Sequence, residues 1–573
     1  MDNLEISQIF RQISKILEIK NDNPFRIRAY ARAAATIESL NEGINTLIRE
    51  DQLETIPGIG KDLAAKIKEI ALTGSLKFHE DLKKTIPLGL LDILEVPGLG
   101  PKTVGLLYKK LGVKSVTELQ ICAKRGRLHK LEGIREKTVS NILAGIDIFK
   151  KGRERISLAK ALQIAEGILN NLSCNKQAKK LMYAGSARRM KETVRDIDIL
   201  AASNNAKKII DSFINLGGVK RILAKGQTRA SIIAASGIQV DLRVVPVMSF
   251  GAALLYFTGS KDFNIRLRQL ALKKKMKINE YGLFSVKGKK EKLLAGKTEE
   301  GIFKSLGLSF LQPELREDRG EVELAIKNRL PKLLELSDIK GDLHVHSNYS
   351  DGLNSISDIA SRAKNKGYEY IAIADHSQSL KIASGLDKEA LKKKKQEIER
   401  LNKEFSSIRI LYAAEVDIDS HGELDYPADL LAEFDVVVAA IHSGFKQPKK
   451  ELTQRIIKAC KNKYVNIIAH PTGRLWGVRE SYDIDFKEIY KVAASTNTAL
   501  EINSFPDRLD LNDINSRQAK AHGVNLAINT DAHNLNHLDF MRLGVATARR
   551  GWIEKKDCIN TKGLKELMRI LKK

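Results

Sequence analysis

The 573-residue sequence contains little cysteine, tryptophan or proline, with 4, 2 and 12 residues of each. The four cysteines are scattered and form no CxxC pair, which argues against a disulfide framework or a thiolate zinc site and indicates a reducing compartment. No apolar run approaches the roughly 20 residues that a transmembrane helix needs. The N-terminus shows no basic segment followed by an apolar one, so we expect no secretion signal and a cytoplasmic location.

Positive charge, in contrast, is abundant and unevenly distributed. The formal net charge is +27, of which residues 1–340 carry +23 and residues 341–573 only +4. A field of one sign this large is typical of proteins that face a polyanion, and nucleic acid is the first interpretation; the alternative is a highly charged surface that only keeps the chain in solution. Nine of the eleven histidines lie beyond residue 341. The C-terminal part therefore indicates metal chemistry.

The hydrophobic pattern divides the chain into regions. Residues 1–150 are expected to form short helices, and residues 155–315 mix helical patterns with strands. Residues 316–340 are charged and flanked by prolines, which favours a linker with a short helix. From residue 342 onward, short apolar strands alternate with helical stretches, a pattern that predicts βα units and a parallel sheet or barrel.

A glycine-containing motif recurs near the N-terminus, at residues 56–61 and 96–101, with a poorer copy at 131–138 that lacks the second glycine. In each copy a turn leads into a helix, whose free N–H groups and dipole favour a phosphate. One copy alone would be an ordinary helix connection, but two in so basic a segment resemble helix-hairpin-helix elements, which hold the DNA backbone. The candidate DNA contacts are Gly58, Gly60, Lys61, Gly98, Gly100 and Lys102.

Three carboxylates form the first candidate catalytic cluster. Asp196 and Asp198 lie two apart on a predicted strand and therefore point to the same side. Asp241 lies within an apolar strand, where an unpaired carboxylate is costly unless a cation compensates it. A DxD pair alone is most often a surface feature, but a Gly-Ser turn at residues 185–186 precedes it and can hold a triphosphate. Together these groups suit two Mg²⁺ or Mn²⁺ ions and a phosphoryl transfer.

The segment Tyr-Phe-Thr-Gly-Ser at residues 256–260, together with the three aspartates, resembles the family X DNA polymerases over roughly residues 1–315. The resemblance implies a nucleotidyltransferase palm whose aspartates bind two metal ions, with Asp241 accepting the proton of the primer 3′-hydroxyl. It also implies that Lys66 forms the Schiff base of an N-terminal lyase, although Arg26 replaces a nearby lysine of the animal enzymes. The implied nucleotide contacts, to triphosphate, sugar, base pair and template, are Gly185, Ser186, Arg189, Tyr256, Phe257, Gly259, Asn264 and Arg268.

A second candidate cluster lies in the C-terminal part, where histidines and acidic residues follow the apolar strands. In βα barrels these positions meet at one edge, and imidazoles with carboxylates suit Mn²⁺, Zn²⁺ or Fe²⁺. The set resembles the PHP (polymerase and histidinol phosphatase) domain. That resemblance implies three metal ions bridged by Glu415, with Asp375 orienting an imidazole and Arg474 meeting a phosphate. The nine implied ligands are His344, His346, Asp351, His376, Glu415, His442, His470, Asp531 and His533.

The expected fold is multidomain: α-helical helix-hairpin-helix N-terminal domains, an α+β nucleotidyltransferase palm with thumb, and a C-terminal distorted (β/α)7 PHP barrel. The expected boundaries are 1–85 for a lyase-like domain, 86–153 for a fingers-like domain, 154–260 for the palm, 261–315 for the thumb, 316–340 for the linker and 341–573 for the PHP domain.

The combination matches family X polymerases of bacteria and archaea, and it implies gap filling in base excision repair with a PHP 3′→5′ exonuclease. AP endonuclease and 3′-phosphodiesterase activities of the PHP site are implied as well. The expected partners are gapped or nicked primer–template DNA and dNTPs, with no membrane, for a monomer near the nucleoid. Two alternatives stay open: a polymerase with a purely structural PHP domain, and a PHP phosphomonoesterase that the basic half tethers to DNA.

Overall fold

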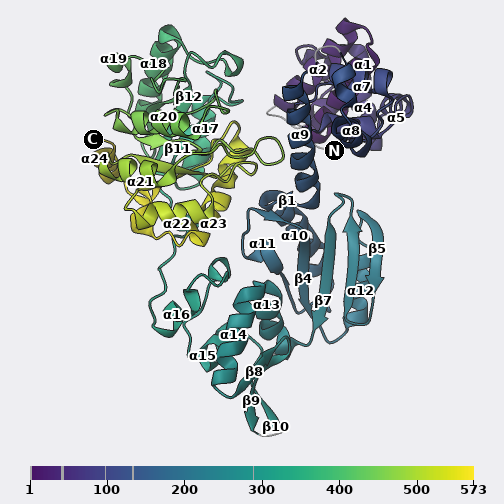
Figure 1. Cartoon of the computed structure of the whole chain (residues 1–573), viewed down its shortest axis with the longest axis vertical. Helices are drawn as coiled ribbons and strands as arrows, with labels where there is room; N and C mark the ends of the chain where they lie inside the picture. Colours follow the sequence, from purple (N-terminus) through teal and green to yellow (C-terminus); the bar gives the residue numbers. More distant parts are fainter. Residues whose placement is uncertain (1–2, 40–43, 97, 132–133, 288–289, 573) are drawn as a thin grey trace. The chain divides into compact units, whose positions relative to one another are not determined.

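The computed structural model describes residues 3–39, 44–96, 98–131, 134–287 and 290–572. The chain divides into two compact units, one of Met1–Arg153 with Gly477–Glu480 and the other of Glu154–Trp476 with Ser481–Lys573. Figure 1 shows the elements of each unit. Among these described residues, no helix is both long enough and apolar enough to cross a membrane.

The described residues of the first unit up to Arg153 form helices joined by turns, with no strand among them, as their hydrophobic spacing predicted. Along the first helix, Ile6, Phe10, Ile13 and Leu17 recur every three to four residues and are fully buried. They belong to one core shared by all the helices of the unit. These helices are α1 (Asn3–Lys20), α2 (Pro24–Ser39), α3 (Ile44–Arg49), α4 (Lys61–Thr73), α5 (Lys77–Lys84), α6 (Gly89–Leu94), α7 (Pro101–Leu111), α8 (Val116–Lys124) and α9 (Glu136–Glu154).

The second unit begins with a five-stranded sheet in the order β2-β4-β7-β6-β5, in which β4 and β7 are parallel and the other neighbours antiparallel. Ile197 and Ile199 of β4 pack with two helices on one face, so the alternate residues Asp196 and Asp198 point to the other. The elements here are β1 (Ile156–Ser157), α10 (Leu158–Ser173), β2 (Lys180–Tyr183), α11 (Gly185–Arg188), β3 (Thr193–Val194), β4 (Asp196–Ala202), α12 (Ala206–Ile214), β5 (Val219–Lys225), β6 (Arg229–Ala234) and β7 (Gln239–Val245).

Three helices and a three-stranded antiparallel sheet follow, with the strand order β10-β9-β8. The segment after them, which we expected to act as a linker, packs tightly: Val322 and Ala325 enter the same core, and Arg316 and Glu321 are fully buried. The elements are α13 (Phe250–Thr258), α14 (Lys261–Lys273), β8 (Met276–Asn279), β9 (Gly282–Lys287), β10 (Lys290–Ala295), α15 (Glu299–Ser305) and α16 (Glu321–Ile326).

A seven-stranded parallel sheet forms the last part, and its strands pair in sequence order from β11 to β17. A parallel bridge between Val345 and Ala532 joins its two ends, so the sheet nearly closes into the predicted barrel. Leu567 and Leu571 of the last helix pack into the inner core with Tyr370 and Ala499, which begin their strands. The opposite, C-terminal edge of the strands is left for polar side chains.

The strands of the barrel are β11 (Gly341–Val345), β12 (Tyr370–His376), β13 (Arg409–Asp417), β14 (Val436–Ala440), β15 (Ile467–Ile468), β16 (Ala499–Asn503) and β17 (Leu526–Asn529). Its helices are α17 (Ile356–Asn365), α18 (Lys388–Glu404), α19 (Ala428–Leu431), α20 (Lys449–Lys461), α21 (Phe486–Ser495), α22 (Asp513–Ala521), α23 (Met541–Arg550) and α24 (Leu564–Leu571).

Candidate catalytic sites

The two inner carboxylates of the palm lie side by side, because Asp198 of β4 and Asp241 of β7 are register partners. Gly185, in the turn after β2, lies close to the carboxylate of Asp198. A Cβ atom on Gly185 would lie 2.2 Å from Asp198 Oδ2, and the residue has a φ of +60°. Glycine is therefore required at this point, both for its backbone conformation and for the space that the carboxylate occupies.

Two polar residues that the sequence did not single out hold Asp241. Ser231 Oγ donates to Asp241 Oδ1, and Gln239 Nε2 donates to Oδ2 at 2.9 Å. Asp198, Asp241 and Ser231 line one cleft of about 240 Å³, which Phe257 also borders. The cleft has room for part of a nucleotide, and both carboxylates line it.

These carboxylates repel one another, so a bound cation would stabilise their ionised forms. Burial, together with the neighbouring carboxylates of Asp196 and Asp241, raises the pKa of Asp198 to about 7. Hard oxygen donors that repel one another fit divalent ions such as Mg²⁺. Among the described residues, sets of three or more ligand atoms within 4.8 Å of one another occur only in the barrel, so the palm carboxylates are gathered less tightly.

The predicted nucleotide contacts fall into two places. Arg189 follows the Gly185–Ser186 turn, and its Nη1 donates to the carbonyl oxygen of Thr258, next to Gly259. Tyr256, Asn264 and Arg268 line a separate small hollow in the thumb region. There Asn264 Nδ2 donates to the Tyr256 carbonyl at 2.7 Å, and Arg268 Nε donates to the Asn264 carbonyl at 3.2 Å. Phe257 contacts the ring of Tyr256 edge-on but borders the carboxylate cleft instead.

Glu415 lies at the centre of the barrel's polar edge. Its carboxylate oxygens lie 2.8 Å from His376 Nδ1 and 3.0 Å from His470 Nε2. His442 Nε2 follows at 3.4 Å and His344 Nε2 at 3.5 Å. One buried carboxylate thus faces imidazoles from several different strands, an arrangement typical of a group that bridges metal ions.

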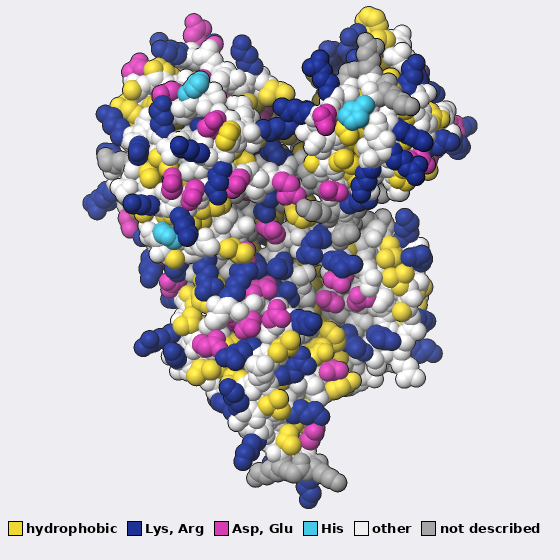
Figure 2. Space-filling model, viewed as in Figure 1, with side chains coloured by type: hydrophobic (Ala, Val, Ile, Leu, Met, Phe, Trp, Pro, Cys, Tyr) yellow, Lys and Arg dark blue, Asp and Glu magenta, His cyan; other side chains and the backbone are white. Residues whose placement is uncertain are grey.

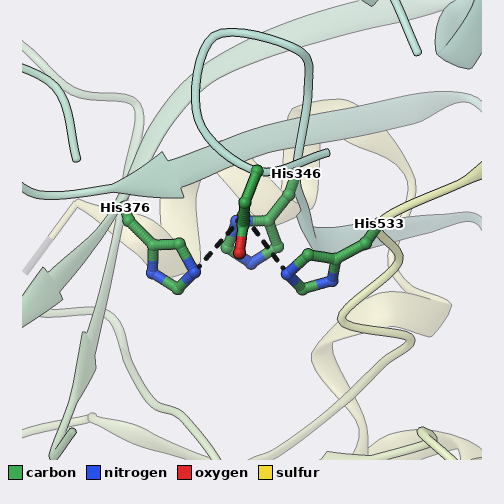
Figure 3. Close-up of side chains that lie close together, drawn as sticks. His346, His376 and His533 are labelled. Carbon is green, nitrogen blue, oxygen red and sulfur yellow. Dashed lines mark ion pairs between the residues drawn. The ribbon is translucent and has the colours of Figure 1, made fainter. Parts of the chain in front are cut away.

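The remaining ligands surround this centre. Asp351 lies between two imidazoles, with its Oδ1 3.5 Å from His376 Nε2 and 3.4 Å from His533 Nε2. Figure 3 shows His346, His376 and His533 converging, with dashed lines marking the ion pairs. Three overlapping sets of side chains could each hold a metal ion. The first set is His346, Asp351, His376 and His533. The second is His344, His346 and Asp531, and the third is His376, Glu415 and His442. All nine predicted ligands therefore lie at one site.

The barrel cluster fits divalent metals in its donor chemistry and in its unsatisfied atoms. His346 Nδ1 and His470 Nδ1 are buried without a hydrogen-bond partner among the described residues. Burial and the imidazoles of His533 and His376 lower the pKa of His346 to about 4, which leaves it neutral and able to ligate. Burial alone would raise the pKa of Glu415, but the surrounding imidazoles hold it well below its usual value.

Carboxylates behind the cluster orient its imidazoles. Glu501 Oε1 lies 2.8 Å from His344 Nδ1, and Asp417 Oδ1 accepts from His442 Nδ1. Neither was predicted. Asp375, which we expected to orient an imidazole, has no hydrogen bond to one among the described residues, although the charge of His346 acts on it. Asp375 accepts a hydrogen bond from the backbone N–H of Ser347 at 2.7 Å and pairs with the fully buried Lys394 at 2.8 Å. These contacts stabilise the turn after β11.

Arg474 does not face the cluster. Its Nη2 donates to the carbonyls of Arg508 and Leu509, at 2.6 and 2.9 Å, and pairs with Glu192 at 2.9 Å. Arg508 lies nearer to the ligands, with its Nε 3.3 Å from Asp531 Oδ2. Its Nη1 is buried and has no hydrogen-bond partner among the described residues. A cation at this edge therefore comes from Arg508 rather than from Arg474.

The glycine motifs of the first unit present open backbone. Gly60 and Gly100 precede α4 and α7, and added Cβ atoms there would meet nothing within 4 Å, as at Gly98. Gly58 and Gly98 have φ values of +84° and +85°. Lysine and arginine side chains are frequent on the face that Figure 2 shows. Such turns leave helix N–H groups accessible to a phosphate.

Two further predictions concern the same unit. Lys66 is mostly covered; its Nζ pairs with Asp62 and lies 5.8 Å from the centre of the Phe78 ring. Arg26 also lies over the Phe78 ring, with its Cζ 5.0 Å from the ring centre. In the third glycine motif, residues 132 and 133 lie outside the described residues.

Comparisons with known proteins agree with this arrangement. Family models match a helix-hairpin-helix domain at residues 1–76, a SAM-like helix-hairpin-helix tandem at 90–147, a DNA polymerase beta thumb at 253–317 and a PHP domain at 342–505. The DNA polymerase/3′-5′ exonuclease PolX of Bacillus subtilis is 40% identical over 575 residues, which cover 100% of both chains. The chain therefore belongs to the family X DNA polymerases that carry a C-terminal PHP domain.

Two more distant relatives match parts of the chain. Rat DNA polymerase lambda is 24% identical over 342 residues, which are 55% of this chain and 56% of the relative. A probable phosphatase of Thermoanaerobacter is 30% identical over 203 residues, which are 34% of this chain and 78% of the relative.

Proposed function

We propose that the chain is a DNA-directed DNA polymerase that fills short gaps during base excision repair and trims primer ends with a PHP 3′→5′ exonuclease. The observation that carries this proposal is the presence of two separate carboxylate sites on one chain. Asp198 and Asp241 form one in the palm, and Glu415 with its imidazoles forms the other in the barrel. The relative from Bacillus subtilis, whose name includes both activities, supports it.

In the palm, each residue has a task that follows from its position. Asp196, Asp198 and Asp241 would hold two divalent ions, which supply charge stabilisation for the attacking and leaving oxygens when bound. Asp241, fixed by Ser231 and Gln239, would accept the proton of the primer hydroxyl. The turn that begins at Gly185 offers backbone N–H groups to the triphosphate next to these carboxylates.

In the barrel, the nine ligands would hold divalent ions that activate a water molecule and brace a phosphodiester. Glu501 and Asp417 hold imidazoles by their Nδ1 atoms and so direct the Nε2 atoms to the site. Arg508 adds a positive charge beside Asp531. The same chemistry extends the proposal to AP endonuclease and 3′-phosphodiesterase activities, which also cleave phosphate esters of DNA.

The first unit would hold gapped or nicked primer–template DNA by its backbone. Gly60 and Gly100 begin helices whose N-termini are open, and Lys61 and Lys102 follow them. Lyase chemistry at Lys66 is the weaker part of the proposal, since Asp62 and Phe78 already occupy its surroundings. Reduction with borohydride in the presence of abasic DNA would trap a covalent adduct if Lys66 forms a Schiff base. We place the protein in the cytoplasm near the nucleoid, as a monomer.

A gapped duplex with a labelled primer tests the proposal directly. The purified chain should extend the primer when Mg²⁺ or Mn²⁺ and dNTPs are present, and should shorten it when dNTPs are withheld and Mn²⁺ is present. Extension without shortening would favour a structural PHP domain. If the chain shortens neither DNA strand but hydrolyses a small phosphate monoester, the result would favour a phosphatase that the basic half tethers to DNA. The Thermoanaerobacter relative is named as a probable phosphatase.

A further inference from the structure

One arginine of the barrel contacts the nucleotide-binding turn of the palm. Arg550 is the last residue of α23, and its side chain is 3% exposed. Its Nη1 donates to the carbonyl oxygen of Arg189 at 2.6 Å and to Glu317 Oε1 at 3.0 Å. Its Nη2 donates to Asp513 Oδ2 at 2.7 Å, within the barrel itself. Arg550 thus binds the barrel through Nη2 and the palm turn through Nη1.

Arg189 is held at both its main chain and its side chain. Its Nε donates at 3.0 Å to Glu317 Oε1, the same oxygen that accepts from Arg550. Its Nη1 donates to the carbonyl of Thr258. Among the described residues, the side-chain hydrogen bonds of Arg189 come from its Nε and Nη1 atoms and none comes from Nη2. The guanidinium is therefore fixed in orientation with one amino group left for a ligand.

Glu317 joins the two guanidinium groups. Its carboxylate is only 10% exposed, and burial alone would raise its pKa. The charges of Arg550, Arg189 and Lys191 outweigh the burial, so the pKa lies below its usual value and the group stays ionised. A carboxylate that two buried guanidinium groups share has little freedom to move, because a displacement breaks a charged hydrogen bond to one or the other.

We propose that Arg550 is a positioning residue of the polymerase site: it fixes Glu317 and the Arg189 carbonyl, and thereby presents Arg189 Nη2 to the triphosphate of the incoming nucleotide. The PHP domain would then be a structural part of the polymerase active site as well as a phosphoesterase. This inference rests on the proposed function, because it takes Arg189 as a triphosphate contact.

The test measures kcat and KM for the correct dNTP on a one-nucleotide gap, with the full chain and Mg²⁺. Arg550→Met should raise KM about tenfold, the loss of one charged hydrogen bond. Its kcat should stay within about twofold, because nothing it touches takes part in chemistry. Arg550→Lys should recover part of the affinity. Shortening of a single strand with Mn²⁺ should be unchanged, which shows that the barrel is intact.

Arg549 supplies a matched control one residue away. It also joins the barrel to the part of the chain that precedes it, through Glu314 Oε1 at 2.7 Å and the Leu334 carbonyl at 3.0 Å, but neither of these hydrogen bonds involves Arg189. Arg549→Met should leave KM unchanged. An equal rise in both variants would assign the effect to the interface in general and overturn the proposal, and so would an unchanged KM in Arg550→Met.

Two further variants separate the possible failures. Arg189→Met should raise KM at least as much as Arg550→Met; if it does not, the assignment of Arg189 in the proposed function fails. A rise in Arg189→Met without one in Arg550→Met overturns only the positioning role. If Arg550→Met does not fold, Glu317→Gln decides in its place. That variant keeps the volume of the side chain and should raise KM severalfold, and a KM equal to that of the unaltered chain contradicts the inference.

Discussion

Asp198 and Asp241 are paired in register on two parallel strands that are neighbours in the sheet but well separated in the sequence. Strand pairing thus determines how the two carboxylates face each other, and the turn at Gly185 determines how closely a ligand can approach them. The relationship explains why small changes in backbone structure at this point should affect chemistry more than stability.

Gly185→Ala should abolish most of the extension activity. The new Cβ atom would lie 2.2 Å from Asp198 Oδ2, so the carboxylate or the turn must move. A displacement of about 1 Å at reacting groups can reduce the rate about 100-fold, and we expect a loss of at least that size in single-turnover gap filling.

Gly167→Ala is the control for this change. Gly167 lies within α10, and an added Cβ atom would meet nothing within 4 Å. This variant should keep its activity and melt at the same temperature or higher, because alanine favours a helix interior by about 1 kcal/mol. Equal activity in both variants would contradict the close approach at Gly185.

A buried ion network should dominate the stability of the thumb region. Glu299 accepts from Arg188 Nη2 at 2.6 Å and from Arg316 Nη1 at 2.5 Å. Arg316→Met should lower the free energy of unfolding by about 1.5–3 kcal/mol, because the buried Glu299 loses the charged hydrogen bond from Arg316 and keeps only Arg188 as a cationic partner. Glu291→Gln, which breaks the exposed pair with Lys277, should cost about 1 kcal/mol or less. Differential scanning calorimetry would measure both.

The same network should weaken in acid. Burial would raise the pKa of Glu299, but Arg316 and Arg188 outweigh it and lower the pKa below its usual value. Its contribution to stability is therefore complete above the unfolded pKa of about 4.3 and is lost as the pH falls through the folded value. The difference in melting temperature between the unaltered chain and Glu299→Gln should shrink between pH 5 and pH 3, roughly the range of this titration. A constant difference would contradict the assignment.

DNA binding should depend on salt through the glycine motifs. Each neutralised phosphate contributes about −0.9 to the slope of log K against log salt in duplex DNA. If Lys61 and Lys102 each contact one phosphate, replacing either by alanine should make the slope about 0.9 less steep. Lys395→Ala, on the exposed surface of the barrel, should leave it unchanged. Fluorescence anisotropy at several salt concentrations gives these slopes, and identical slopes would exclude the contacts.

Metal content should follow the geometry of the barrel cluster. Glu415 lies at the centre of the imidazoles, whereas Asp351 lies at the edge with a third of its side chain exposed. Glu415→Gln should therefore lose more bound Mn²⁺ or Zn²⁺ than Asp351→Asn, as elemental analysis of dialysed protein would show. Because imidazole-rich sites bind Mg²⁺ weakly, shortening should prefer Mn²⁺ while extension accepts either ion. Full shortening with Mg²⁺ alone would contradict this assignment.

The fold and the meeting of the candidate ligands at one site could be predicted because they rest on local patterns. The candidate barrel ligands lie near the C-terminal end of an apolar strand or after it, and strand order alone brings such positions to one edge. Glu501 was missed although it carries the same signal as Asp241, a carboxylate within an apolar strand. Asp417 was missed although it stands two residues after Glu415 on the same strand, and therefore on the same face.

Other relationships had no local signal. Arg550, Glu317 and Arg189 meet only because α23 packs against the turn of the palm, and no spacing in the sequence indicates it. The segment at residues 316–340 was expected to be a linker because it is charged and flanked by prolines. Arg316 is buried there because Glu299 compensates its charge.

The central claim is that the palm and the barrel hold two independent active sites, and a crossed pair of variants tests it most directly. Asp198→Ala and His344→Ala would each be incubated with the same labelled gapped duplex, with Mn²⁺, and with or without dNTPs. Asp198→Ala should lose extension and still shorten the primer, and His344→Ala should do the reverse. Asp211→Ala, at an exposed carboxylate paired with Lys225, should keep both activities. Loss of primer shortening in Asp198→Ala would show that one site performs both reactions and would contradict the account.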